Sequence, residues 1–367
     1  MYSNFDHKMM RRALILALRG RGAVSPNPRV GAVVVGVDGR ILAEGWHRQY
    51  GGAHAEVDAL RRVKPGAAAG GTLYVNLEPC CHYHKTPPCT DAIISSGVTR
   101  VVAAITDPYL QVNGAGFKRL QSAGIAVSVG LMAGKAAYLN RGFLSTINQG
   151  RAWCAAKTAL SLDGKMAAPD GQSKWISGVE ARTLAHRLRA DHDAVLVGGG
   201  TVAADDPELT VRLIRGVNPV RIILSPHAGL PAEGRIASSA SQIRTILVVG
   251  ECWKGSVPPS IEVLRMPEHQ SVIDPVELLT RLPSFGVTSV LVEGGAGVLS
   301  SFLQAGVLDE ISIAYAPSVI GKGLAPFDRF IPESWEDRPR FSVSAVKRYG
   351  EEVVVTYHPA RRASLPV

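Results

Sequence analysis

The sequence predicts two α/β domains, residues 1–149 and 150–367, and three observations lead to this prediction. A chain of 367 residues is long for a single domain. In both parts, β-branched apolar runs such as 29–35 (RVGAVVV) alternate with stretches of helical spacing. A polar, glycine-containing stretch at 143–151 lies between the two series, and we interpret it as the crossing between domains.

The first domain opens with a predicted helix. Apolar residues recur at helical spacing between Met10 and Leu18, and Asn4 or Asp6 could cap the helix. The apolar stretch is short, is flanked by arginines and has no convincing small-residue cleavage site, so we do not interpret it as a signal peptide. No apolar run reaches the roughly 18 residues that span a bilayer. We therefore expect a cytoplasmic protein without a membrane partner.

A hairpin is expected next, with strands 29–35 and 41–45 joined at the Asp38-Gly39 turn. The later elements of this domain alternate in type. Helices are expected at 56–63, 91–96 and 117–123, and strands at 72–77, 100–105 and 126–129.

The second domain shows the same alternation in a longer series. Strands are expected at 153–160, 194–198, 220–224, 245–249, 289–292, 310–315 and 352–357, with helices at 179–189, 275–282 and 298–304.

The positive charge of the chain lies entirely in the first domain. Residues 1–149 hold 17 Lys and Arg against 8 Asp and Glu, whereas residues 150–367 hold 23 of each, and the whole chain carries +9. A basic domain suits an anionic partner, either a phosphorylated metabolite or a nucleic acid. A solvated basic surface without a partner is the alternative.

The cysteines indicate a metal site rather than a disulfide framework, because three of the five lie within ten positions. His54, Cys80 and Cys89 form a soft donor set that suits Zn²⁺ with one open position for water. Such a metal lowers the pKa of its water, and Glu56 is placed to carry protons between that water and a leaving amine. A closed zinc knuckle that also uses Cys81 or His82 is the alternative, and it leaves Glu56 without a purpose.

The motif His54-Ala55-Glu56, followed by Glu78-Pro79-Cys80 and by 85–89 (KTPPC), resembles the riboflavin-pathway deaminase family. Eight residues separate the two cysteines, unlike the Cys-x-x-Cys of nucleoside deaminases, and His84 stands where the family usually has Gly. The resemblance implies a cytidine-deaminase-like fold. It also implies substrate contacts from Asn27, His47, His82, Lys85 and Asp107. Without this resemblance, we would interpret Asn27 and His47 as residues that form hydrogen bonds within loops.

The second domain resembles the riboflavin-pathway reductase family through the segments 157–165 (KTALSLDGK), 204–212 (ADDPELTVR) and 293–295 (EGG). That family has a dihydrofolate-reductase-like fold and uses NADPH. The resemblance implies substrate binding by Ser173, Trp175, Arg189, Asp205, Leu209, Arg212 and Glu293, and cofactor binding by Lys157, Trp175, Gly199, Thr201, Gly294 and Gly295.

Within this set, Arg189 and Arg212 have the chemistry for a phosphate, and Asp205 is a candidate catalytic proton donor. Taken from the residues alone, the glycines at 198–200 and 294–297 fit tight βα turns as well as a phosphate site. The segment Asp205-Asp206-Pro207 equally fits a turn with capping carboxylates.

Together the two resemblances imply a bifunctional enzyme of riboflavin biosynthesis that uses Zn²⁺ and NADPH. It would deaminate 2,5-diamino-6-ribosylamino-4(3H)-pyrimidinone 5′-phosphate and then reduce the ribosyl group to ribityl. We expect a homo-oligomer that acts on this small phosphorylated substrate and on no nucleic acid. The main alternative is a nucleic-acid base deaminase with an appended domain, although no basic stretch is interleaved with aromatic residues for base stacking. A non-catalytic scaffold is the third hypothesis, and the intact zinc motif argues against it.

Overall fold

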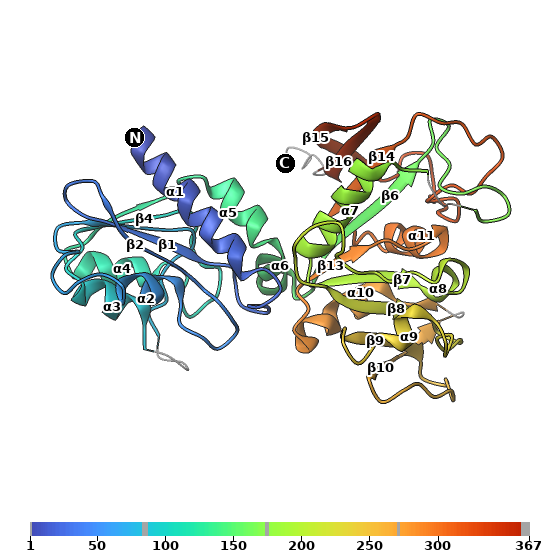
Figure 1. Ribbon diagram of the computed structural model, residues 1–367, viewed down its shortest axis with the longest axis horizontal. Coiled ribbons are helices and arrows are strands. Elements are labelled where there is room, and N and C mark those ends of the chain that lie inside the picture. Colours follow the sequence, from blue (N-terminus) through green and yellow to red (C-terminus); the bar gives the residue numbers. More distant parts are fainter. Residues whose placement is uncertain (1, 83–86, 173–175, 270–271, 361–367) are drawn as a thin grey trace. The chain divides into compact units, whose positions relative to one another are not determined.

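The computed structural model describes residues 2–82, 87–172, 176–269 and 272–360 (Figure 1). The chain divides into two compact units, residues 1–150 and 151–367. The stretch 143–151, expected to be a polar crossing, is helical for most of its length. It forms α6 (Arg141–Gln149), which ends at Gly150 in the left-handed conformation. The division between the two units falls within this stretch, after Gly150. Its helical form was not foreseen, and it arises because Phe143 and Ile147, four residues apart, give this polar helix one apolar face.

The first unit is built on a five-stranded sheet in the order β2-β1-β3-β4-β5. Strand β1, second in this order, is antiparallel to β2 and β3, whereas β3, β4 and β5 are parallel. Its strands are β1 (Gly31–Val35), β2 (Ile41–Trp46), β3 (Thr72–Val75), β4 (Arg100–Ala103) and β5 (Ala126–Val129). All five residues of β1 are buried, which explains its unbroken apolar sequence.

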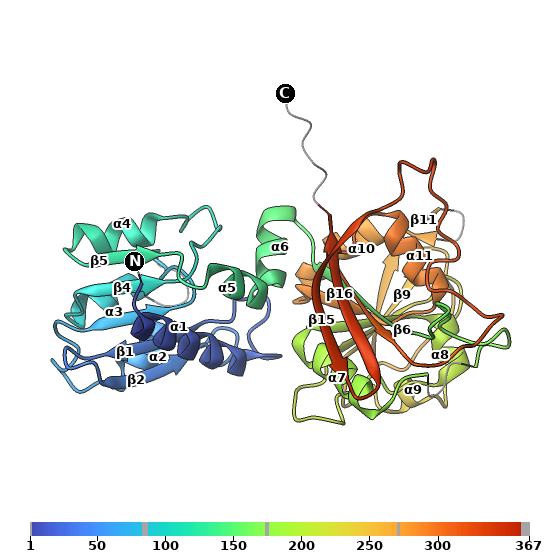
Figure 2. The ribbon, with the colours of Figure 1, turned by 90° about the horizontal axis from the view of Figure 1, so that it is seen from above.

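Helices cover both faces of this sheet (Figures 1 and 2). One face carries α1 (Asn4–Ala17), the 3₁₀ turn η1 (Leu18–Gly20) and α5 (Ala133–Leu139). The other face carries α2 (Ala55–Leu60), α3 (Cys89–Ser95) and α4 (Ala115–Ser122). The two helices that begin next to the zinc motif therefore lie on the same side of the sheet.

Helix α1 is capped by Ser3, not by Asn4 or Asp6 as the sequence suggested. The Ser3 hydroxyl accepts the Asp6 N–H while the Asp6 carboxylate accepts the Ser3 N–H, which is a capping box. Asp6 is buried and also accepts from the Tyr74 hydroxyl at 2.7 Å and from Arg100 at 2.8 Å. One carboxylate thus fastens the helix start to β3 and β4.

The second unit contains a nine-stranded sheet in the order β10-β9-β8-β7-β13-β6-β14-β16-β15. The strands from β10 to β14 are parallel, and β16 and β15 add an antiparallel hairpin at one edge. The strands are β6 (Trp153–Leu160), β7 (Ala194–Gly198), β8 (Val220–Leu224), β9 (Thr245–Gly250), β10 (Ile261–Met266), β13 (Ser289–Val292), β14 (Glu310–Tyr315), β15 (Phe341–Tyr349) and β16 (Glu352–Pro359). A small separate hairpin joins β11 (Glu268–His269) and β12 (Val272–Ile273).

Two layers of helices enclose this sheet. Helices α10 (Pro275–Arg281) and α11 (Ala296–Gln304) pack on one face, together with the 3₁₀ turn η2 (Leu282–Phe285). Helices α7 (Val179–Asp191), α8 (Gly199–Asp205) and α9 (Arg235–Ser238) pack on the other. The parallel strands end at a common edge, and in such sheets ligands bind at that edge. In the described part of the chain, no helix has the length and apolarity that crossing a membrane requires.

We predict that Asp6→Asn lowers the stability of the first unit by about 2 kcal/mol at neutral pH, since it removes a charged acceptor of four hydrogen bonds. Burial opposes ionisation of Asp6, but hydrogen bonds from Arg100, Ser3 and Tyr74 outweigh it and hold the pKa of this carboxyl well below its usual range. A lowered pKa contributes stability above the unfolded-state pKa of about 3.9, and this contribution is lost as the pH falls below it.

Thermal unfolding at pH 7 and at pH 3 measures both effects. The melting temperature of the Asn variant should lie below that of the parent protein at pH 7, and the gap should narrow at pH 3. Asp38→Asn, at an exposed turn, is the control and should leave the melting temperature unchanged. An equal gap at both pH values would contradict this account of Asp6.

Candidate active sites

Three donor atoms from separate segments converge in the first unit. His54 precedes α2, Cys80 follows β3 by a short loop, and Cys89 is the first residue of α3. The His54 Nδ1 atom lies 3.2 Å from the Cys89 Sγ atom and 3.5 Å from the Cys80 Sγ atom. The donor atoms of all three residues lie within 4.8 Å of one another.

This donor set fits zinc. Ligands of a tetrahedral site with Zn–N near 2.1 Å and Zn–S near 2.3 Å lie roughly 3.6 Å apart, close to the separations observed here. The backbone N–H of Cys89 points to the Cys80 sulfur at 3.3 Å. The hydrogen bond from the Cys89 thiol outweighs the opposing effect of burial and, with those from His54 and the Cys89 N–H, lowers the pKa of Cys80 to about 4. The pKa of Cys89 is raised well above its usual value by the same contact with Cys80 and by burial, so a cation is needed to ionise both thiols together.

Glu56 lies in the first turn of α2, two residues after His54, and is almost fully buried. Burial raises the pKa of this carboxyl to about 7. Glu56 lines the same cavity as His54 and Cys80. A buried carboxyl that can hold or release a proton near neutral pH therefore stands beside the metal-ligating residues.

The cavity has a volume of about 320 Å³, within the size range of small-molecule sites. Of the residues expected to bind substrate, Asn27, His47, His82 and Asp107 line it. Lys85 and His84 lie outside the described residues. Its other walls come from residues that the sequence reasoning missed, mainly Tyr50, Tyr109, Val112, Phe143 and Ile147. None of these belongs to a recognisable motif, and only the fold brings them to the cavity.

Asn27 and His47 form a hydrogen-bonded pair in this wall. The His47 Nδ1 atom lies 3.0 Å from the Ala53 carbonyl oxygen, so it carries the proton, and the Nε2 atom accepts from the Asn27 Nδ2 group at 3.2 Å. Burial lowers the pKa of His47, which favours this neutral form. The pair presents a fixed pattern of polar atoms to the cavity.

Glu78 is a further functional residue that the sequence identified only as part of a motif. Its buried carboxylate accepts backbone N–H groups of Asp107, Gly114, Gly116 and Phe117 at 3.0–3.3 Å. This segment carries Asp107, whose pKa is raised to about 6 by burial. Glu78, two residues before Cys80, therefore ties one wall of the cavity to the zinc motif.

The second unit contains a larger cavity of about 790 Å³ at the carboxyl ends of β7 and β13 and beside β6. Among the residues predicted from the reductase resemblance, seven line this cavity, namely Lys157, Gly199, Thr201, Asp205, Glu293, Gly294 and Gly295. Ser173 and Trp175 lie outside the described residues. The sequence reasoning missed several other lining residues, among them Arg182, Asp328 and Arg329.

The glycines at this edge allow two strand ends to approach closely. A Cβ atom on Gly199 would lie 2.5 Å from the Ser225 hydroxyl oxygen, and one on Gly294 would lie 2.9 Å from Val298. The Gly295 N–H donates to the Thr201 hydroxyl at 3.1 Å, which ties the two glycine turns together. Gly200 faces open space. The cavity is large enough for a dinucleotide, and its turns expose backbone N–H groups at the start of α11, so it fits NADPH.

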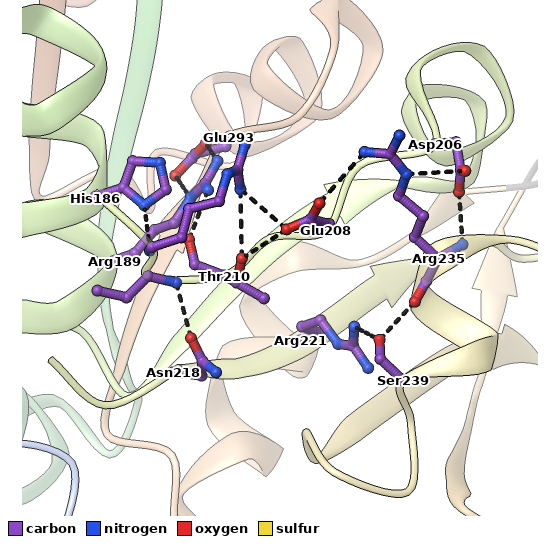
Figure 3. Close-up of polar contacts among 12 residues, drawn as sticks. His186, Arg189, Asp206, Glu208, Thr210, Asn218, Arg221, Arg235, Ser239 and Glu293 are labelled. Atoms are coloured by element: carbon purple, nitrogen blue, oxygen red, sulfur yellow. Dashed lines mark hydrogen bonds and ion pairs between the residues drawn. The ribbon is translucent and has the colours of Figure 1, made fainter. Parts of the chain in front are cut away.

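Arg189 and Glu293 form a buried, two-pronged ion pair with distances of 2.8 and 2.7 Å (Figure 3). The remaining Arg189 nitrogen, Nη1, donates to the Thr210 carbonyl at 3.0 Å. Burial opposes ionisation of Glu293, but Arg189 holds the pKa of this carboxyl below its usual range. Arg189 does not line the cavity and has these protein partners already, so its predicted contact with a substrate phosphate requires that they rearrange.

Arg212, by contrast, is half exposed. Its guanidinium lies 3.3 Å from the Thr210 hydroxyl and 3.5 Å from Glu208, and its backbone N–H donates to His186. Burial, followed by the charges of Arg189 and Arg212, lowers the pKa of His186 to about 4, so this ring is a neutral acceptor. Neither Arg212 nor Leu209 is among the described residues that line the cavity, and Leu209 is buried in the core beside β7.

The comparisons with known proteins agree with this geometry. Residues 3–105 match the cytidine and deoxycytidylate deaminase zinc-binding region, and residues 152–355 match the RibD C-terminal domain. The chain is 40% identical over 363 residues to the riboflavin biosynthesis protein RibD of Escherichia coli (strain K12), covering 95% of this chain and 98% of that protein. It is also 40% identical to RibD of Aquifex aeolicus (strain VF5), covering 97% and 99%.

Solved structures show the same likeness over the whole chain. The chain resembles a diaminohydroxyphosphoribosylaminopyrimidine deaminase/5-amino-6-(5-phosphoribosylamino)uracil reductase from Thermotoga maritima with a TM-score of 0.87, at 37% identity, covering 97% of this chain and 99% of that one. RibD of Acinetobacter baumannii gives a TM-score of 0.84 at 34% identity, with the same coverage. These findings confirm the predicted fold class, a cytidine-deaminase-like domain followed by a reductase domain of the dihydrofolate-reductase-like fold.

We predict that Glu78→Gln loosens the segment 107–117 without unfolding the first unit. The amide of Gln offers one acceptor oxygen and places an NH₂ group against backbone N–H donors, so two of the four hydrogen bonds are lost. Hydrogen exchange at the amides of Asp107, Gly114, Gly116 and Phe117 should accelerate by about tenfold or more.

Asp91→Asn is the matched control, because Asp91 pairs with Arg119 at the surface of the neighbouring helices. It should leave these four exchange rates unchanged. Equal exchange in the Glu78→Gln variant and the parent protein would show that Glu78 does not hold this segment.

Proposed function

The chain belongs to the RibD family of bifunctional riboflavin-biosynthesis enzymes, a zinc-dependent deaminase joined to an NADPH-dependent reductase, and on this premise we propose which of its residues carry out each reaction. The substrate of the first unit would be the diamino-hydroxy-pyrimidine ribosyl phosphate acted on by the Thermotoga maritima relative. The observation that carries the proposal is the convergence of His54, Cys80, Cys89 and Glu56 at one small cavity.

His54, Cys80 and Cys89 would hold the zinc ion. Zinc bound there would lower the pKa of water, so that the water could attack the ring carbon at neutral pH. Glu56 would carry one proton of the attacking water to the ring nitrogen and the other to the ring amine as the carbon–nitrogen bond breaks, so that ammonia leaves and the ring carbonyl forms. Its burial keeps these protons away from bulk solvent.

The pyrimidine would be oriented by the paired Asn27 and His47, whose polar atoms are fixed by the Ala53 carbonyl. His82 and Asp107 line the same cavity and would contact the ring or its substituents. Lys85 remains a predicted contact to the phosphate. The basic excess of the first unit favours approach of an anionic substrate.

In the second unit, Gly199, Thr201, Gly294 and Gly295 would receive NADPH, and Lys157 lies in the same cavity. NADPH bound there would supply hydride to the ribosyl C1 carbon. Asp205 lines the cavity and would donate the proton to the opening ribose. Arg189, Leu209, Arg212 and Glu293 would form or support the substrate end, together with the predicted contacts of Ser173 and Trp175.

The nucleic-acid base deaminase is not favoured, because the family match covers both units and explains the second one. The homo-oligomer expected from the sequence remains a prediction.

A direct test of the two activities supplies the enzyme with the pyrimidine ribosyl phosphate, with and without NADPH. We expect ammonia release in both cases and consumption of NADPH only after deamination. Ammonia release without any later oxidation of NADPH would contradict the second activity.

We predict that Glu56→Gln keeps the zinc ion but lowers the rate of deamination by about a thousandfold, because the amide cannot carry a proton. Metal analysis and ammonia release measure the two effects, and the reductase activity of the same chain reports that it is folded. Asp58→Asn is the matched control, because Asp58 lies on the same helix but outside the cavity, where it pairs with Arg62 and accepts the Trp46 N–H. Loss of zinc together with activity would mean that Glu56 acts as a ligand.

We predict that Arg212→Ala raises the KM of the reductase for its phosphorylated substrate by about tenfold, because the half-exposed guanidinium would no longer meet the phosphate. The affinity for NADPH should stay the same. Arg235→Ala, which removes a neighbouring exposed partner of Glu208, is the control and should change neither quantity. Equal weakening of substrate and NADPH would place Arg212 outside the phosphate site.

A further inference from the structure

Asn140 lies at the junction between α5 and α6, far along the chain from the deaminase motifs, and yet it contacts the loop that carries Asn27. It is buried and belongs to no motif identified in the sequence. Its side chain forms two hydrogen bonds with a single residue of that loop. The Arg29 N–H donates to the Asn140 Oδ1 atom at 2.8 Å, and the Asn140 Nδ2 group donates to the Arg29 carbonyl at 3.1 Å.

A second buried amide completes the arrangement. The Asn76 Nδ2 group donates to the same Arg29 carbonyl at 2.9 Å, and the Asn76 Oδ1 atom accepts the Gly31 N–H at 2.8 Å. Asn76 directly follows β3 and fixes the loop to the sheet, whereas Asn140 fixes it to the helices. Both the N–H and the carbonyl of Arg29 are therefore bound by side chains, which leaves this peptide little freedom.

The backbone fixed at Arg29 is connected to Asn27 and His47, the two polar residues proposed to orient the pyrimidine. Asn27 lies two residues before Arg29, and the carbonyl of Val30, the next residue, accepts the backbone N–H of His47 at 2.9 Å. A rotation of the Arg29 peptide would therefore displace Asn27 on one side and His47 on the other. The pair that these residues form across 3.2 Å depends on both positions.

Helix α6 adds the apolar part of the same wall. Phe143 and Ile147 lie three and seven residues after Asn140, and both line the cavity. The Asn140 carbonyl accepts the Leu144 N–H at 2.9 Å, so Asn140 also begins this helix. One residue thus sets the polar loop and the apolar helix of the cavity relative to each other.

We propose that Asn140 is a positioning residue of the deaminase, which clamps the Arg29 peptide and thereby holds Asn27 and His47 in the arrangement that binds the pyrimidine. The proposal rests on the substrate role proposed for Asn27. It makes the end of the first unit, after its last strand, part of the deaminase site. It assigns no part in the chemical step to Asn140, because the Asn140 side chain bonds the backbone of Arg29.

Steady-state kinetics of the full-length, zinc-loaded enzyme test the proposal. Asn140→Ala should raise the deaminase KM for the pyrimidine ribosyl phosphate by about tenfold, with kcat changed by less than about threefold, since ground-state binding is lost rather than the proton transfer. Zinc content and the kinetics of the reductase should stay the same. Thr146→Val is the matched control on α6, because the Thr146 hydroxyl donates to the Gly142 carbonyl of its own helix.

A double-mutant cycle with Asn27→Ala separates positioning from general stability. If Asn140 acts through Asn27, Asn140→Ala should raise KM by less than about twofold in the Asn27→Ala background, because the contact it supports is already gone. The same tenfold factor in both backgrounds, or an unchanged KM in the Asn140→Ala variant, would overturn the proposal. An unchanged KM in the Asn27→Ala single variant would instead refute the substrate role of Asn27.

Asn140→Asp covers the case in which the alanine variant does not fold. The carboxylate keeps the acceptor for the Arg29 N–H but faces the Arg29 carbonyl without a donor, so the clamp is half lost. KM should rise by about threefold or more with zinc retained. A folded Asp variant with the KM of the parent protein would overturn the proposal as well.

Discussion

The deaminase depends on one constraint, the meeting of His54 and Cys89, at the starts of two short helices, with Cys80 on the loop after β3. His54 and Cys89 can approach each other only because α2 and α3 pack side by side on one face of the five-stranded sheet. The same packing buries Glu56, and burial rather than any single partner raises its pKa to about 7. Metal-binding residues and a proton carrier are thus produced by one structural arrangement.

Buried polar side chains, each bonded to backbone groups, hold the surrounding loops. Glu78 binds four N–H groups of one loop, and Asn140 with Asn76 binds the peptide of another. The reductase uses a comparable device, in which Arg189 and Glu293 neutralise each other at the edge of the cavity. In each case a polar side chain near a cavity forms its hydrogen bonds or ion pair with other groups of the protein. These interactions fix the positions of the loops that line the cavity.

The sequence predicted most strands because their apolar runs are long and buried, as in β1 and β7. It missed β10 and β15, the two edge strands of the nine-stranded sheet, which have many exposed residues. It also did not predict that most of the crossing stretch is the helix α6, because polar residues make up much of that helix. The zinc ligands could be predicted because their spacing is itself the chemical signal. Asn140 could not, because its role exists only once residues more than a hundred positions apart are brought together.

X-ray absorption at the zinc edge of the fully active enzyme tests the central claim most directly. The account predicts one nitrogen donor from His54, two sulfur donors from Cys80 and Cys89, and one light-atom ligand from solvent. The spectrum should lose one sulfur in a Cys89→Ser variant and stay unchanged in Cys81→Ser. A third sulfur or a second imidazole in the parent enzyme would contradict the account, because a site closed by protein leaves no position for the reacting water.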